Sequence, residues 1–303
     1  MTTAPKVGFV GLGAMGRGMA GCLQQRGLLE CVWNRSAAVS DEIARDLQVP
    51  VAAGLVELAA ACDVVVLCVS ADSDVLDVVD QLAGSLRPGA IVIDCSTVSA
   101  DTAREAARRL GCRDVDFLDA PVSGGVEGAR QGTLAIMVGG PEAAFERARP
   151  VLEAMGRTVT RFGDTGAGQA AKATNQIMCA GIIQAVAEAM AFAKAEGLPL
   201  EALIDTLGKG AGSSWYFVHR APNIVRGSYP PGFRVRLHEK DLRICREMAA
   251  RHGVELPVVE AALRQYRELI EQGHGDEDIS TLFRLKDALF EAGDRGAGEP
   301  PGG

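Results

Sequence analysis

The sequence has no excess of positive charge, which argues against one broad class of function. It contains 31 Lys and Arg residues against 39 Asp and Glu residues, and its formal net charge is −8. A protein that binds nucleic acid along its surface normally presents a basic face. We therefore expect no nucleic-acid partner, although a local group of Arg and Lys could still bind a small anionic substrate.

Metal-ligand patterns and long apolar runs are also missing. The eight cysteines form no CxxC pair, and the four histidines are not grouped with them at ligand spacing, so we expect no metal. Most cysteines lie inside apolar runs, which predicts small buried side chains in a reducing, cytoplasmic environment. No stretch approaches about 18–20 uninterrupted apolar residues. We therefore expect neither a membrane span nor an apolar signal segment.

The first half of the sequence alternates short β-branched runs with amphipathic segments such as 40–47 and 100–110. Strands that are apolar on both faces and are separated by helices are typical of a parallel sheet covered on both sides. The expected strands are 7–10, 31–33, 64–69, 91–93, 117–118 and 135–138. This half therefore predicts an α/β, doubly wound (Rossmann) domain.

The second half has the composition of a helical domain. Residues 167–196 are rich in Ala, Met, Ile and Gln and contain no proline. They predict a single helix of about 45 Å, at 1.5 Å per residue, that joins the two domains. Further helices are expected at 200–207, 240–252, 257–272 and 280–291.

The boundary between the two domains is expected near 163–166, where two glycines occur. This gives a dinucleotide-binding Rossmann domain over 1–164 and an all-helical substrate and oligomerisation domain over 165–292. Residues 293–303 are rich in Gly and Pro, and they predict a disordered tail.

The most informative motif is a glycine-rich turn, Gly11-Leu12-Gly13-Ala14-Met15-Gly16, directly after the first expected strand. Gly11 allows the tight turn, Gly13 lets the backbone approach a pyrophosphate, and Gly16 permits close packing of helix on strand. The pyrophosphate would lie at the amide-rich start of the following helix. Glycines alone often merely close a turn, but the strand-turn-helix context favours a bound dinucleotide.

The second strand should end beside the adenosine ribose, and it ends in Asn34-Arg35-Ser36 rather than in an acidic residue. An Asp or Glu there would hold the ribose hydroxyls of NAD and repel a 2′-phosphate. Arg35 can instead offer its guanidinium to that phosphate, and Ser36 a hydroxyl. The alternative is an exposed loop arginine. The position favours NADP over NAD.

Three later loops also follow expected strands, where a doubly wound sheet lines its ligand crevice. Val69 ends the third strand, and Ser96 and Thr97 follow the fourth, although these two could simply cap the next helix. The loop 119–125, Asp-Ala-Pro-Val-Ser-Gly-Gly, offers a carboxylate or oxyanion the hydroxyl of Ser123 and the unobstructed amides of the glycines. Taken alone, it could be an ordinary loop.

Four motifs, in order, resemble the β-hydroxyacid dehydrogenase family. This family includes 3-hydroxyisobutyrate dehydrogenases, tartronate semialdehyde reductases and glyoxylate/succinic semialdehyde reductases. The motifs are the turn at 11–16, the loop at 119–125, Gly-Gln-Ala-Ala-Lys-Ala-Thr-Asn at 168–175 and Lys-Asp-Leu at 240–242. The resemblance extends over nearly the whole chain short of the tail, and four motifs in sequence order are a specific signal.

The resemblance implies a role for each matching residue. Lys172 would be the catalytic acid/base, and Asn175 would help to hold the substrate. Ser123, Gly124 and Gly125 would bind the substrate carboxylate, and Lys240 would lie near the nicotinamide and the substrate. Alternatively, Lys172 is a solvated helix lysine and Lys240 a surface partner of Asp241 or Glu239.

The chemistry of Lys172 and Asn175 agrees with these roles. Residues three apart on a helix share a face, so both side chains can reach one substrate. Oxidising an alcohol requires a base that takes the hydroxyl proton, and reducing an aldehyde requires an acid that protonates the alkoxide. The predicted activity is hydride transfer between NADP, or NAD, and a short 3-hydroxy acid or its semialdehyde.

Other functions remain open on the same fold. A 6-phosphogluconate dehydrogenase usually has a much longer helical domain. Imine reductases and non-catalytic cofactor-binding scaffolds carry another residue where Lys172 stands. The substrate is undecided, because 232–242 looks most like tartronate semialdehyde reductases whereas 34–36 and 275–278 look more like glyoxylate/succinic semialdehyde reductases. Members of the family are commonly dimers or tetramers, so the resemblance implies a homodimer or homotetramer.

Overall fold

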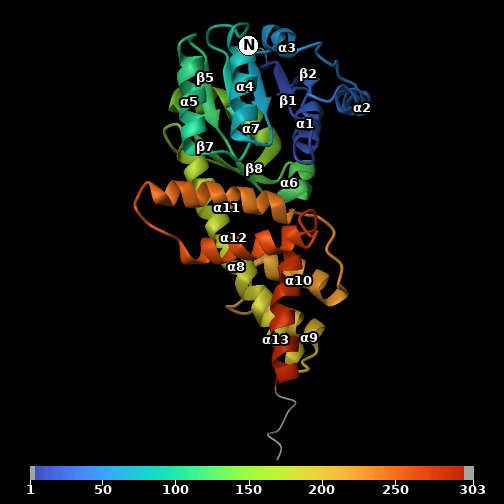
Figure 1. The fold of residues 1–303 in the computed structure, drawn as a ribbon. Helices are drawn as coiled ribbons and strands as arrows, with labels where there is room; N and C mark the ends of the chain where they lie inside the picture. The colour runs from blue at the N-terminus through green and yellow to red at the C-terminus, as the bar shows by residue number, and fades with distance from the viewer. Residues whose placement is uncertain (1–3, 297–303) are drawn as a thin grey trace, which may run out of the picture. The chain divides into compact units, whose positions relative to one another are not determined.

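The computed structural model describes residues 4–296 (Figure 1). The chain divides into two compact units, an N-terminal unit that ends at Lys172 and a helical unit that begins at Ala173. This division falls inside one helix, and the domain boundary at 164/165 stays a prediction.

The N-terminal unit is an α/β sheet structure, as the sequence predicts. Its strands are β1 (Val7–Val10), β2 (Leu29–Trp33), β3 (Val64–Leu67), β4 (Ile91–Asp94), β5 (Asp116–Asp119), β6 (Val122–Ser123), β7 (Leu134–Gly139) and β8 (Gly156–Gly163). Its helices are α1 (Gly16–Gln25), α2 (Ala37–Leu47), α3 (Leu55–Ala61), α4 (Asp72–Ala83), α5 (Ala100–Gly111), α6 (Gly125–Gln131) and α7 (Glu142–Met155).

The sheet has the strand order β2-β1-β3-β4-β5-β7-β6, and β8 pairs with β7. The strands β2, β1, β3, β4 and β5 are parallel, which confirms the doubly wound topology. Strand β7 departs from the expected parallel sheet, because it runs antiparallel to both β5 and β6. Strand β8 is parallel to β7 and was not expected. From Thr158 onward its residues alternate between exposed and half-buried positions, so it lacks the continuous apolar run of a central strand.

Alternation along the strands explains why both faces of the sheet are covered. Val66 on β3 belongs to a buried cluster that also contains Met19 of α1 and Leu152 of α7. Its neighbour Val65 belongs to a second cluster that contains Val79 of α4. Successive strand residues point to opposite faces, so the two clusters lie on the two sides of the sheet.

The register of the parallel strands places their carboxyl ends at one edge. Val10 pairs with Leu67, Leu67 with Asp94, and Asp94 with Asp119. The loops that follow β1, β3, β4 and β5 therefore leave the sheet at the same edge, where ligands bind in open α/β sheets.

The helical unit is built on the second part of α8 (Ala167–Ala195), a single 29-residue helix that confirms the predicted long helix. The other elements are α9 (Leu200–Leu207), α10 (Trp215–Arg226), α11 (Val235–Ala250), α12 (Pro257–Glu271), η1 (Ile279–Leu282) and α13 (Phe283–Gly296). The sequence did not predict α10, which contains Pro222, and α11 begins before the predicted start at 240.

Two features of this unit concern the expected absence of a membrane span and the expected disordered tail. By length and composition alone, α8 could cross a membrane, but a core helix passes the same test, and its buried residues pack with α11 and α12 in one hydrophobic cluster. At the other end of the chain, residues 293–296 of the expected disordered tail continue α13. The rest of that tail, 297–303, lies outside the described residues.

Candidate active site

The glycine turn between β1 and α1 is held by backbone contacts that leave no room for side chains at Gly11 and Gly16. The Gly11 N–H donates to the Trp33 carbonyl at 3.0 Å, and Gly11 has a φ of +94°, which favours glycine. A Cβ at Gly11 would overlap the carbonyl oxygen of Cys68, and one at Gly16 would overlap the carbonyl oxygen of Gly11. The turn is therefore packed tightly against β3 and the start of α1.

Gly13, in contrast, faces open space. A Cβ there would meet nothing within 4 Å, and Gly13 and Ala14 are both exposed. Within residues 4–296, the backbone amides of these two residues donate to no protein acceptor. Free amides beside the start of a helix form an anion site, so the turn fits the pyrophosphate of a dinucleotide.

The end of β2 contributes to the candidate site one side chain that bonds the glycine turn and one charged side chain. The Leu12 N–H donates to Asn34 Oδ1 at 3.0 Å, so Asn34 ties the end of β2 to the glycine turn. Arg35 is 85% exposed, and its Nη1 lies 3.1 Å from Asp74 Oδ1 on α4, a partner that the sequence did not suggest. Ser36 is exposed at the N-cap position of α2 and makes no side-chain capping bond. Arg35 and Ser36 are thus exposed near the turn.

The loops after β3 and β4 are joined by Ser96. The Val69 N–H donates to Ser96 Oγ at 2.9 Å, and the Ser96 N–H donates to Asp94 Oδ1 at 2.9 Å. The helix cap suggested as an alternative role is made by another residue, because Ser99 Oγ accepts from the Thr102 N–H at the start of α5. Ser96 is buried and Thr97 half-buried, so Ser96 shapes this edge of the sheet.

The loop after β5 begins with a buried carboxylate. Asp119 is fully buried, and it accepts hydrogen bonds from the N–H groups of Gly166 (2.7 Å) and Gln169 (2.9 Å). Burial raises the pKa of the Asp119 carboxyl, whereas these backbone donors oppose the shift by favouring the ionised form. Sequence reasoning missed this contact, because it joins residues that are far apart in the chain. Further along the loop, Ser123 is half-buried.

The glycines of this loop are exposed, as binding to a substrate carboxylate requires. Gly124 and Gly125 both have positive φ angles, +134° and +65°, and α6 begins at Gly125. Because glycine has no side chain, nothing of these two residues covers their own backbone amides.

Lys172 lies in the second turn of α8. Its side chain is buried, with 7% of the residue exposed, and this contradicts the alternative of a solvated helix lysine. Gln169, one turn earlier, is also buried and bonds to the loop after β4 through Ser96 and Val98. Lys172 thus follows a segment of α8 that is fixed to the sheet edge.

In the helical unit, two predicted site residues belong to one hydrogen-bond network. The Asn175 Nδ2 donates to Gln176 Oε1 at 2.8 Å, and the Gln176 Nε2 donates to Asp241 Oδ2 at 2.8 Å. The Lys240 Nζ lies 3.2 Å from Asp241 Oδ1, so the pairing suggested as its alternative role is present, although Asp241 is buried and not on the surface. The network connects Asn175 with Lys240 through buried polar groups.

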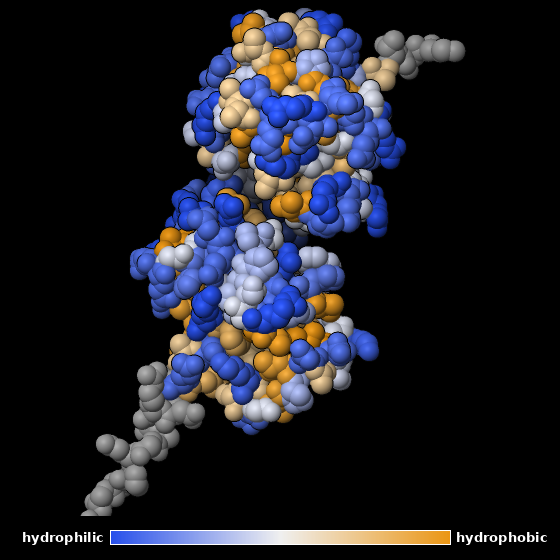
Figure 2. Space-filling view, turned by 90° about the vertical axis from the view of Figure 1, so that its right-hand side faces the viewer, coloured by the Kyte–Doolittle hydropathy of each residue, from blue (hydrophilic) through white to orange (hydrophobic). Residues whose placement is uncertain are grey.

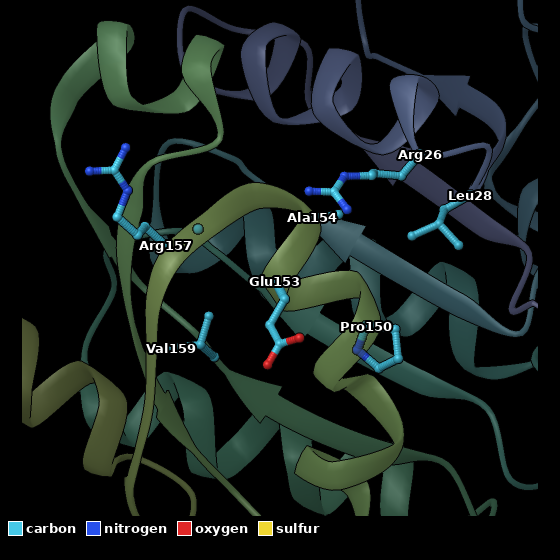
Figure 3. A pocket seen from close by; sticks show the side chains of 8 residues that line it. Arg26, Leu28, Pro150, Glu153, Ala154, Arg157 and Val159 are labelled. Atoms are coloured by element: carbon cyan, nitrogen blue, oxygen red, sulfur yellow. The ribbon is translucent and has the colours of Figure 1, made fainter.

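Two further observations concern a possible metal site and a hollow in the surface. No group of three or more His, Cys, Asp and Glu residues that could hold a metal occurs among residues 4–296. A hollow of about 650 Å³ in the N-terminal unit contains none of the predicted site residues (Figure 3). It is lined by Arg26, Leu28, Pro150, Glu153, Ala154, Gly156, Arg157 and Val159.

Comparisons with known proteins match both halves of the chain. Residues 6–163 match the NAD-binding domain of 6-phosphogluconate dehydrogenase, and residues 166–286 match the NAD-binding domain of NADP-dependent 3-hydroxyisobutyrate dehydrogenase. The chain belongs to the β-hydroxyacid dehydrogenase family. It is therefore related to NAD(P)-dependent oxidoreductases, and the predicted family, fold class and cofactor type are confirmed.

Individual members of this family match almost end to end. An NAD-dependent L-serine dehydrogenase of Pseudomonas aeruginosa is 35% identical over 93% of this chain and 98% of its own length. An L-threonate dehydrogenase of Cupriavidus necator is 36% identical over 92% and 95%, respectively. The structure of a Mycobacterium tuberculosis 3-hydroxyisobutyrate dehydrogenase with L-serine superposes with a TM-score of 0.85, at 32% identity, over 93% of this chain and 99% of that chain.

Proposed function

We propose that this family member transfers hydride between a nicotinamide dinucleotide and a short 3-hydroxy acid or its semialdehyde, with Lys172 as the general acid/base. The observation that carries this proposal is the placement of Lys172. It is a buried lysine on α8, directly after a segment that is bonded to the carboxyl ends of β4 and β5. The open glycine turn belongs to the same unit.

Each group has a defined task in this reaction. The dinucleotide, when bound, accepts or supplies the hydride. Lys172 Nζ takes the proton of the substrate hydroxyl during oxidation and returns it to the alkoxide during reduction. Ser123 Oγ and the amides of Gly124 and Gly125 donate hydrogen bonds to the substrate carboxylate. Asn175 orients the substrate, and Lys240 adds a positive charge near the cofactor.

The substrate class follows from the groups that these residues bind. A hydroxyl-and-amide loop recognises a carboxylate, and a lysine base acts on a hydroxyl, so the substrate carries both. Relatives whose names specify L-serine, L-threonate or 3-hydroxyisobutyrate act on compounds of this kind.

A substrate panel tests this function. NADPH and NADH oxidation is measured with short semialdehydes, and NADP and NAD reduction with 3-hydroxy acids and serine. We expect turnover of at least one compound in each direction. Bound cofactor without turnover across the panel would favour a non-catalytic scaffold, and turnover of cyclic imines alone would favour an imine reductase.

The cofactor is proposed to be NADP in preference to NAD, because Arg35 and Ser36 are exposed at the end of β2. We expect Arg35→Ala to lower kcat/KM for NADPH by about 10- to 100-fold, the equivalent of one or two charge-assisted hydrogen bonds. NADH should be affected less than about twofold, since it has no 2′-phosphate. Steady-state kinetics with both cofactors measures this, and Arg45→Ala, an exposed arginine of α2, is the control.

Asp74 should have the opposite effect, because it competes with the phosphate for Arg35. A surface ion pair contributes at most about 1 kcal/mol, so Asp74→Asn is expected to improve NADPH use by no more than about fivefold. Equal losses for NADH and NADPH in Arg35→Ala would contradict the assignment of Arg35 to the 2′-phosphate.

The protein is also proposed to form a homodimer or homotetramer through its helical unit. Met178 and Phe192 are 61% and 53% exposed, and Ala185 and Ala189 extend the same stripe of α8. Phe192 contacts Phe290 of α13 edge to face, and Figure 2 shows hydrophobic residues gathered on part of the surface. Exposed apolar residues along one stripe of a helix are typical of an association surface.

We expect sedimentation velocity to show a dimer or tetramer for the wild type and a monomer for Met178→Glu/Phe192→Glu. The introduced carboxylates would have to be buried in the association surface, which is unfavourable. Val254→Glu, a similar change at another exposed apolar residue of this unit, is the control. A monomeric wild type at micromolar concentration would contradict the proposal.

A further inference from the structure

We propose that Asp119 is a positioning residue for Lys172: its buried carboxylate fixes the first turn of α8, and Lys172 follows in the next turn. The proposal rests on the acid/base role proposed for Lys172. Asp119 itself is fully buried and bonded to the start of α8, so it acts through the helix and not on the substrate.

The carboxylate of Asp119 binds the amides that α8 leaves open at its start. The first N–H groups of a helix have no acceptor within the helix. Asp119 Oδ1 accepts from the Gly166 N–H at 2.7 Å, and Oδ2 accepts from the Gln169 N–H at 2.9 Å. Each oxygen thus holds a different amide, and the negative charge is favourable at the positive end of the helix dipole. Two charge-assisted bonds from one rigid group restrict both translation and rotation of the helix start.

Close packing leaves this contact little freedom. The last residue of β5, Asp119, pairs with Gly139 of β7. A Cβ at Gly139 would lie 2.5 Å from Asp119 Oδ1 and 2.7 Å from the Gly168 nitrogen. A Cβ at Gly168 would overlap the carbonyl oxygens of Met137 and Asp119. The helix start therefore packs closely on the ends of two strands, and neither Gly139 nor Gly168 could carry a side chain without displacing it.

Gln169 provides a second attachment of the same turn. Its Nε2 donates to the Ser96 carbonyl at 2.8 Å, and its Oε1 accepts from the Val98 N–H at 3.2 Å. Asp119 thus holds the turn to the end of β5, while Gln169 holds it to the loop after β4. Lys172 lies three residues beyond Gln169, on the same face of α8, so any movement of this turn moves the lysine.

Two of the other helices, α5 and α10, begin with simpler serine caps. The Oγ atoms of the half-buried Ser99 and Ser214 each accept one amide at the starts of α5 and α10. Neither helix carries a residue proposed here for proton transfer. A fully buried carboxylate is costly to desolvate, as the raised pKa of Asp119 reflects. The start of α8, unlike the starts of α5 and α10, thus has a buried carboxylate cap, and α8 carries the proposed acid/base.

The test measures kcat, KM for a semialdehyde and Kd for NADPH in Asp119→Asn, Asp119→Ala and Ser99→Ala. A displacement of about 1 Å can lower a rate about 100-fold, so we expect Asp119→Asn to lower kcat by about 10- to 100-fold. Asp119→Ala should lower kcat further, because the Asn side chain keeps one acceptor for Gly166. The Kd for NADPH should stay within about twofold, since the glycine turn does not contact Asp119. Ser99→Ala should lower the unfolding temperature and leave kcat unchanged.

The outcomes distinguish a failure of the role proposed for Asp119 from a failure of the role proposed for Lys172. If both Asp119 variants lower the unfolding temperature as Ser99→Ala does and keep the wild-type kcat, Asp119 is a structural cap and the proposal is wrong. If Lys172→Ala keeps wild-type turnover, the proposed acid/base role fails instead. If the Asp119 variants do not fold, Gln169→Leu tests the same turn, and an unchanged kcat in that variant would overturn the proposal.

Discussion

Replacement of Lys172 by alanine is expected to lower kcat by about 10²- to 10⁴-fold, the usual contribution of a general acid or base. The Kd for NADPH should change by less than about twofold, because the proposed pyrophosphate site is the glycine turn and not α8. Stopped-flow absorbance at the nicotinamide band gives the rate, and fluorescence titration gives the Kd.

Lys172→Arg distinguishes proton transfer from a simple need for positive charge. Arginine keeps the charge, but its guanidinium does not release a proton at neutral pH. We therefore expect Lys172→Arg to be nearly as inactive as Lys172→Ala. Recovery of most of the activity in the arginine variant would indicate that the lysine acts only through its charge.

A matched control is available on the same helix. Lys194 lies near the end of α8, where its half-exposed side chain pairs with Asp287. Lys194→Ala removes a lysine from α8 without touching the segment that is bonded to the sheet, and it should keep wild-type kinetics. Loss of cofactor binding in Lys172→Ala, with normal turnover by the enzyme that still binds it, would contradict the assigned role.

The fold was largely predictable because the central strands are apolar on both faces. The run 64–69 is typical of a strand buried between two layers, and β3 occupies most of it. The half-exposed β8 has no such signal. Helix α10 was missed because Pro222 interrupts the helical pattern, although the proline is accommodated inside the helix.

The candidate site was predictable only where its residues form a motif that is local in sequence. The glycine turn can be predicted from consecutive residues, because the strand, the turn and the helix adjoin in sequence. The contact of Asp119 with α8 joins residues 47 and 50 positions apart, and no local pattern indicates it. The identity of the substrate is equally hidden, because the motif residues suit the carboxylate and the hydroxyl that all short hydroxy acids share.

The second large effect is expected at Gly13. Valine at this position should raise the Kd for NADPH by about 100-fold or more, which corresponds to the loss of about 3 kcal/mol of charge-assisted hydrogen bonds. The valine side chain would occupy the space through which a pyrophosphate approaches the backbone amides. Isothermal titration of the variant with NADPH measures the loss.

The folded protein should tolerate this change, and that makes the prediction specific. A Cβ at Gly13 meets nothing within 4 Å, whereas one at Gly11 would overlap the Cys68 carbonyl in a backbone conformation that favours glycine. Gly13→Val should therefore unfold within about 3 °C of the wild type, and Gly11→Val should be strongly destabilised. Gly84→Val, at another open position in the N-terminal unit, controls for the added side chain and should bind NADPH normally. A Gly13→Val variant that binds NADPH as tightly as the wild type would show that the phosphates bind elsewhere, because the added side chain stands directly beside the amides of Gly13 and Ala14.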